Sequence, residues 1–208
     1  MIKGLKICGV SDSKTLNYIL NHRHKPSMIG FITNYEKSRR FIEYNKLQSL
    51  INVDKKKVKF VSVLVNPNDE ILEKIKNLNF DYYQLYDVDP ERTEKIKTKY
   101  KIKIITAITV SVEDDVIKYK NYLEISDIIL FDSKGYHKSE SFDHNLLNEV
   151  PNELNKMIAG NIQIEDIPNF KNKNFMIDLS GALEDENGKK DISKINKLLN
   201  LYAKIWNL

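Results

Sequence analysis

The chain has 208 residues, of which 41% are hydrophobic and 10% aromatic. This length suits one domain with a core of its own, and the hydrophobic content is too high for a disordered protein. The 33 basic and 29 acidic residues nearly balance, and the net charge of +4 gives little reason to expect a nucleic-acid partner.

Short β-branched runs alternate with amphipathic, Lys- and Glu-rich stretches from the N-terminus onward. This alternation predicts strand–helix units. In the first half of the chain the predicted strands are residues 5–8, 28–32, 58–65 and 82–85, and the predicted helices are residues 13–22, 44–51, 69–78 and 90–100. Pro90 suits the first turn of the last of these helices.

The second half repeats the scheme. The predicted strands are residues 102–108, 127–131, 156–159 and 175–179, followed in turn by a helix at 112–123, a short helix at 143–148, a stubby helix at 164–169 and a long helix at 191–206. The apolar stripe of the long helix is expected to pack on the core. It consists of Ile192, Ile195, Leu198, Leu199, Tyr202 and Ile205.

Eight strands, each followed by a helix or a helix-like turn without a linker, predict an α/β fold. We expect residues 1–208 to form a single-domain (β/α)8 TIM barrel. The alternative is an open doubly wound sheet. That fold typically carries a Gly-rich turn after its first strand, and Cys8-Gly9-Val10-Ser11 is not one.

The single cysteine, Cys8, excludes an intramolecular disulfide and gives no sign of an oxidising compartment. No apolar stretch approaches the ~20 residues that span a bilayer, and the N-terminus reads as a strand and not as a signal peptide. We therefore expect a cytoplasmic protein without a membrane partner. A monomer is slightly favoured over a homodimer, because nothing marks a large exposed apolar face.

Catalytic groups of a TIM barrel project from the C-terminal ends of its strands. This rule selects Cys8 after the first strand and Asp132 after the sixth. A thiol and a carboxylate across one barrel mouth can serve as base and acid. The alternatives are an inert, buried cysteine and an aspartate that caps or forms a salt bridge.

The loops after the seventh and eighth strands of many barrels hold a phosphate. Gly160-Asn161 and Ser180-Gly181 occupy these positions, where a missing Cβ permits close approach, although ordinary turn glycines remain an alternative. No metal site is expected, because the four histidines lack ligand spacing with other donors. They are His22, His24, His137 and His144.

Seven segments, in order from end to end, resemble phosphoribosylanthranilate isomerases. They are Lys6-Ile7-Cys8-Gly9-Val10, Lys37-Ser38-Arg39-Arg40-Phe41-Ile42, residues 61–66, Gln84-Leu85, Asp132 with Ser141-Phe142-Asp143, Ile158-Ala159-Gly160, and residues 178–181 with 188–191. No single motif is decisive, but their shared order is fairly specific.

The chain departs from the family pattern in four loops. Tyr86-Asp87 stands where the family has His-Gly, and Gly160-Asn161 replaces a Gly-Gly pair. The glycine-rich loop after the sixth strand is reduced to residues 135–140, and Ser180-Gly181-Ala182 replaces Ser-Ser-Gly. These departures bear on loop closure and substrate affinity.

The resemblance implies an Amadori rearrangement of N-(5-phosphoribosyl)anthranilate that needs no cofactor. Asp132 would be the general acid, with a pKa that is high when the site is closed, and Cys8 the basic thiolate, its pKa lowered by Arg40 or by a cationic intermediate. Arg40, with Arg39 as a rival, would bind the anthranilate carboxylate, and Asp178 would lie near the amine.

Two other functions remain open at this point. One is another sugar-phosphate isomerase or epimerase on the same barrel, since a fold does not fix a function. The other is a non-catalytic paralogue that binds a phosphorylated ligand or a partner protein. The lost glycines favour the paralogue, whereas the retained Cys8 and Asp132 argue against it.

Overall fold

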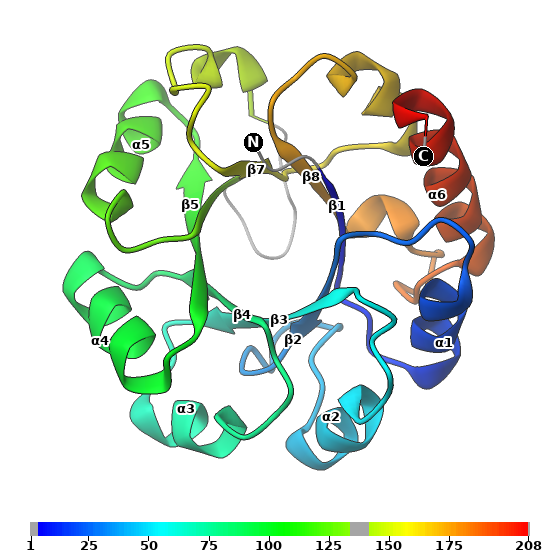
Figure 1. The fold of residues 1–208 in the computed structure, drawn as a ribbon, viewed down its shortest axis with the longest axis horizontal. Coiled ribbons are helices and arrows are strands. Elements are labelled where there is room, and N and C mark those ends of the chain that lie inside the picture. The colour runs from blue at the N-terminus through cyan, green and yellow to red at the C-terminus, as the bar shows by residue number, and fades with distance from the viewer. Residues whose placement is uncertain (1–3, 134–141, 208) are drawn as a thin grey trace.

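Eight parallel strands close into a barrel in the order β1-β2-β3-β4-β5-β6-β7-β8 (Figure 1). The computed structural model describes residues 4–133 and 142–207. The closed order of eight parallel strands confirms the predicted (β/α)8 architecture. The strands are β1 (Gly4–Cys8), β2 (Met28–Ile32), β3 (Lys59–Val65), β4 (Tyr82–Tyr86), β5 (Lys103–Val110), β6 (Ile128–Ser133), β7 (Lys156–Ile158) and β8 (Met176–Leu179).

Helices surround the barrel as an outer ring, and α6 lies beside α1 where the ring closes (Figure 1). The α-helices are α1 (Ser13–Asn21), α2 (Tyr44–Ile51), α3 (Asp69–Ile75), α4 (Pro90–Tyr100), α5 (Glu113–Ile117) and α6 (Ile192–Trp206). Aspartate or asparagine side chains cap the backbone N–H groups at the starts of α1, α3, α4 and α6, which fixes where these helices begin. None of the described helices is both long and apolar enough to cross a membrane.

Several connections in the second half are 3₁₀ turns where a helix was predicted. The expected helix at 112–123 is wrong as a single element, because α5 stops at Ile117 and a 3₁₀ segment, η1 (Lys118–Tyr122), follows. The β-branched pair Val116-Ile117 favours a helix poorly at this point. The other 3₁₀ segments are η2 (His144–Leu147), η3 (Ile164–Phe170) and η4 (Gly181–Leu183).

Alternate residues of each strand face the barrel interior and the helix layer, which produces two apolar clusters. On β1, for example, Leu5 and Ile7 belong to the outer cluster, whereas Cys8 belongs to the inner one. The lower interior is filled by Met28, Val61, Ile105, Leu130, Met157 and Met176. Because these apolar side chains fill the barrel interior toward the N-terminal ends of the strands, the polar interior residues lie at the C-terminal ends.

Candidate active site

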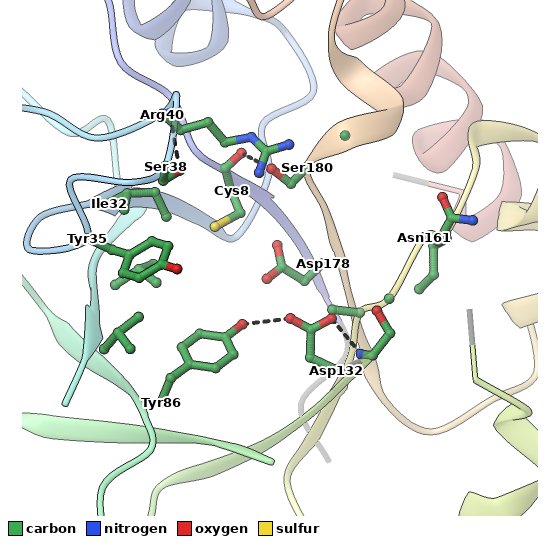
Figure 2. Close-up of a pocket in the computed structure, with 17 residues that line it drawn as sticks. Cys8, Ile32, Tyr35, Ser38, Arg40, Tyr86, Asp132, Asn161, Asp178 and Ser180 are labelled. Atoms are coloured by element: carbon green, nitrogen blue, oxygen red, sulfur yellow. Dashed lines mark hydrogen bonds between the residues drawn. The ribbon is translucent and has the colours of Figure 1, made fainter. Parts of the chain in front are cut away.

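A pocket opens at the C-terminal ends of the strands, and it brings together all eight residues selected from the sequence. They come from β1, β6, β8 and the loops after β2, β7 and β8, and Figure 2 labels the six of them that have side chains, around one space. The eight are Cys8, Arg40, Asp132, Gly160, Asn161, Asp178, Ser180 and Gly181. The rule that strand ends carry the site therefore selected residues that share one pocket.

Cys8 ends β1 and is only 8% exposed. The next residue, Gly9, turns the chain with a φ of +78°, and a Cβ there would lie 2.5 Å from Cδ of Arg40. Burial raises the pKa of the Cys8 thiol, and the ammonium groups of Lys6 and Lys190 act against this rise. Arg40 or a cationic intermediate was predicted to favour the thiolate; Lys6 and Lys190 act most strongly on the thiol, and Arg40 also interacts with it.

Lys6 lies two residues before Cys8 on the same inward face of β1 and is fully buried. Its Nζ donates to Oδ2 of Asp178, 2.6 Å away, and the two residues are register partners across the β1–β8 seam. Burial alone would lower the pKa of Lys6, but Asp178 and Cys8 together outweigh it and the pKa is raised. Lys6 is therefore a charged partner of the site that the strand-end rule did not select.

Asp178 presents its second carboxylate oxygen to the pocket. Oδ1 is buried and has no hydrogen-bond partner among the described residues. In Figure 2 this carboxylate lies between Cys8 and Asp132. An unsatisfied buried acceptor is costly, so a ligand N–H or O–H group at this position would relieve it.

Asp132 on β6 receives two hydrogen bonds, and neither comes from a cation. The Tyr86 hydroxyl donates to Oδ2 at 2.7 Å, and the backbone N–H of Ser133 donates to Oδ1 at 2.8 Å. Burial raises the pKa of Asp132 to about 6, although the Tyr86 hydrogen bond acts in the opposite direction. A carboxyl group that holds its proton near neutral pH is suited to general acid catalysis.

Arg40 is held by a buried carboxylate that the sequence did not single out. Its Nε donates to Glu184, and its Nη2 donates to the other oxygen of Glu184 at 3.0 Å. Arg39, the rival, has a side chain that is 63% exposed and approaches Glu184 only at 3.4 Å. Three of the five N–H groups of a guanidinium remain for a ligand after this contact, so Arg40 is the better carboxylate-binding candidate.

Glu184 also anchors the loop after β8. Lys190 donates to Glu184 at 2.9 Å and to the backbone oxygen of Ser180 at 2.9 Å. The Ser180 hydroxyl in turn donates to the backbone oxygen of Cys8 at 3.1 Å. Glu184 and Lys190 were missed because they lie in an irregular loop, where no periodicity reveals burial.

Two loops that lack family glycines keep a glycine-like backbone. Asp87 has a φ of +55° and Asn161 a φ of +54°, both in the left-handed region. Asn and Asp tolerate this region better than other residues with a Cβ. The neighbouring Gly160 is required, because its φ is +93° and a Cβ would lie 2.9 Å from the Ser133 backbone nitrogen. The altered loop at 135–140 lies outside the described residues.

None of the histidines that the structure describes lines the pocket. His22 and His24 follow the end of α1, and a ring nitrogen of His22 is 2.7 Å from the His24 backbone oxygen. Within residues 4–133 and 142–207, no three His, Cys, Asp or Glu side chains are arranged to hold a metal ion.

The sequence matches known proteins over almost its whole length. Residues 5–201 match the family model described as N-(5'phosphoribosyl)anthranilate (PRA) isomerase. The N-(5'-phosphoribosyl)anthranilate isomerase of Rhizobium johnstonii is 31% identical over 211 residues, which cover 96% of this chain and 94% of the relative. The enzyme of the same name from Staphylococcus carnosus is 28% identical and covers 93% and 94% of the two chains.

Solved structures agree in fold. The phosphoribosylanthranilate isomerase of Thermotoga maritima superimposes with a TM-score of 0.83 at 26% identity, covering 98% of this chain and 99% of that one. A structure of a phosphoribosyl anthranilate isomerase in complex with reduced 1-(o-carboxyphenylamino)-1-deoxyribulose 5-phosphate has a TM-score of 0.82 at 24% identity and covers 98% of this chain and 100% of that one.

Proposed function

The chain belongs to the N-(5'-phosphoribosyl)anthranilate isomerase family, and from this premise we propose that Asp132 and Cys8 are the acid and base of its reaction. The enzyme converts N-(5-phosphoribosyl)anthranilate into 1-(2-carboxyphenylamino)-1-deoxyribulose 5-phosphate in tryptophan biosynthesis. The observation that carries the assignment is that the half-buried carboxyl of Asp132 and the buried thiol of Cys8 line one pocket in a barrel of this family.

Asp132 opens the sugar ring. It donates its proton to the furanose ring oxygen while the bond between that oxygen and C1 breaks, and the nitrogen lone pair forms the iminium. A donor is needed because the leaving alkoxide is strongly basic. The raised pKa of Asp132, about 6, supports this role, since part of the enzyme keeps the proton at neutral pH.

Cys8 completes the rearrangement. Its thiolate removes the proton from C2 of the iminium, the C2 electrons form the C1–C2 double bond, and the resulting enolamine tautomerises to the ketone. Proton transfers are the only chemistry required, so no cofactor is needed. The buried ammonium of Lys6 beside Cys8 supports the thiolate.

The remaining pocket residues fit the two charged ends of the substrate. Arg40 is the candidate for the anthranilate carboxylate, because a planar guanidinium matches that group. The free acceptor of Asp178, Oδ1, suits the anthranilate N–H. The phosphate is assigned to the two loops formed by Gly160, Asn161, Ser180 and Gly181, which line the same pocket.

The test follows the loss of substrate fluorescence, with the unstable substrate generated in place from anthranilate and phosphoribosyl pyrophosphate. We expect turnover in the wild type and a loss of at least about a hundredfold in Cys8→Ala and in Asp132→Asn. Asp127→Asn is the matched control, because Asp127 precedes the opposite end of β6, and it should keep normal turnover.

Each result separates one part of the proposal from the rest. Turnover that survives both changes would retain the reaction and overturn the acid–base pair. A folded wild type without turnover would contradict the function itself. It would favour an enzyme for another sugar phosphate, or a non-catalytic protein that binds a phosphorylated ligand.

A further inference from the structure

We propose that Tyr86 is a positioning residue for the general acid: its hydroxyl holds Asp132 and directs the acid proton into the pocket. The inference rests on the proposed role of Asp132. Tyr86 stands where the family pattern has histidine, so the resemblance does not itself supply this role.

The contact is part-buried, and a second residue of β4 supports it. Tyr86 is 8% exposed at the end of β4, and its hydroxyl lies 2.7 Å from Oδ2 of Asp132 (Figure 2). Gln84, fully buried two residues earlier on the same face of β4, donates its amide N–H to the Tyr86 oxygen at 3.2 Å. Because that oxygen already accepts a hydrogen bond, the hydroxyl proton is oriented toward Asp132.

Two donors, one from β4 and one from β6, fix the carboxyl plane. The Tyr86 hydroxyl holds Oδ2, and the Ser133 backbone N–H holds Oδ1. A protonated carboxyl has one O–H to donate. The two carboxyl lone pairs that accept from Tyr86 and from Ser133 are already occupied, so neither of them carries the acid proton. The acid proton is therefore directed to a remaining lone pair, where a substrate oxygen in the pocket can take it.

The hydroxyl stays a donor over the working pH range. Burial and the facing Asp132 raise the pKa of Tyr86 well above its ordinary value of 10, with Cys8 and Asp178 acting in the same direction. The other charged groups that act on Asp132 are Asp178, which favours its protonated form, and Lys6, which opposes it. A histidine in place of Tyr86 would itself titrate near pH 6.5, so tyrosine removes that complication.

The pH profile of kcat/KM provides the readout. Only enzyme with a protonated Asp132 and an ionised Cys8 reacts, and the pKa of Asp132, about 6, lies below that of Cys8. Activity therefore rises with pH up to about 6, where loss of the acid proton begins to cancel the gain of thiolate, and then levels off. We call this levelling-off near pH 6 the limb of the profile, and its pH reports the pKa of Asp132.

Tyr86→Phe removes only the hydroxyl. We expect the limb to move upward by about one to two pH units, the effect of losing a hydrogen bond to a charged group. On the low-pH arm Asp132 is fully protonated in both proteins, so the rates there compare positioning alone, and we expect a fall of roughly tenfold. Tyr83→Phe is the matched control: Tyr83 is a buried tyrosine on the same strand that faces the helix layer, and its removal should change neither.

A limb that stays at the wild-type pH, or a low-pH rate that is unchanged, overturns the proposal. A second measurement needs neither substrate nor a variant: the 13Cζ resonance of Tyr86 should follow the titration of Asp132 near pH 6. A resonance that is flat across that range overturns the contact. If the wild type lacks turnover while this resonance titrates, the proposed function fails and the contact stands.

Discussion

Burial acts on the two reactive groups in the same direction, with opposite consequences. It raises the pKa of Asp132, which helps an acid to keep its proton, and it raises the pKa of Cys8, which hinders a base. The base therefore needs a nearby positive charge more than the acid does. Lys6 supplies most of it, since it is fully buried on the same face of β1, and Lys190 adds to it.

Lys6→Met should weaken the thiolate. Without the ammonium, and with Asp178 left unpaired nearby, the pKa of Cys8 should rise by at least about one unit, which lowers the thiolate fraction about tenfold. We expect the alkylation of Cys8 by iodoacetamide at pH 8 to slow by about that factor. Because Cys8 is the only cysteine, the reaction reports this site alone.

Lys14→Met is the control for this measurement. Lys14 is exposed on α1, so removing its charge should leave the alkylation rate unchanged. Thermal melting establishes that both variants are folded, since an unfolded chain would react faster and not more slowly. Equal alkylation rates in folded Lys6→Met and the wild type would contradict the assigned role of Lys6.

The sequence predicted the residues at strand ends and missed those that act on them. Cys8 and Asp132 could be found because a barrel places its strand ends at one mouth. Lys6 could also have been found, because it lies two residues before Cys8 and must face the same side. Glu184 and Lys190 could not, since their burial depends on how one loop folds over Arg40.

At the scale of elements, the strands were easier to predict than the connections. Buried parallel strands are continuous β-branched runs, so their positions are plain in the sequence. The later connections are short 3₁₀ turns whose form depends on local details. Pro168 inside η3, for example, has no N–H to donate, which disfavours a regular α-helix there.

The loop after β7 offers a test of backbone against side chain. Asn161 has a φ of +54°, and we expect Asn161→Gly to keep the stability and KM of the wild type, because glycine adopts this conformation freely. Asn161→Ala should be less stable than Asn161→Gly by about 1 kcal/mol and should raise KM. Urea denaturation and steady-state kinetics of the pair measure both effects. Equal stability of the two variants would show that the backbone conformation is not limiting.

The seam between β1 and β8 closes the barrel, and its interior contains one buried ion pair. Breaking this pair with Lys6→Met leaves the buried Asp178 carboxylate uncompensated and should cost about 3–5 kcal/mol of unfolding free energy. Replacing both partners, Lys6→Met with Asp178→Leu, should recover most of that loss of stability, because no unpaired charge is left buried. Urea titrations of the two single variants and the double variant measure the coupling. A double variant as unstable as the sum of the single ones would contradict it.

The whole molecule divides into an apolar barrel base and a polar mouth. The base is filled by methionine and branched side chains, whereas the buried charges of Lys6, Asp178, Glu184 and Lys190 lie toward the mouth. Buried charges are weak contributors to stability even when paired. The mouth is thus arranged for proton transfer at some cost to the free energy of folding.

Asp132 gives that cost a measurable pH dependence. Its pKa is about 6 in the folded protein against 3.8 ordinarily, so the folded state binds the proton more tightly than the unfolded chain. The associated stability is fully present below about pH 3.8 and is lost as the pH rises through 6. Roughly two units at about 1.4 kcal/mol each give a total loss of about 3 kcal/mol, of which about 2 kcal/mol falls between pH 4.5 and 7.5.

Asp132→Asn should lack this dependence. Over that pH range we expect the unfolding free energy of the wild type to fall by about 2 kcal/mol relative to the variant, measured by urea denaturation at several pH values. A constant penalty from the asparagine does not affect this difference, because it is the same at every pH. Parallel curves for the wild type and Asp132→Asn would mean that burial does not raise the pKa of this carboxyl, and that the acid must acquire its proton affinity only when the substrate is bound.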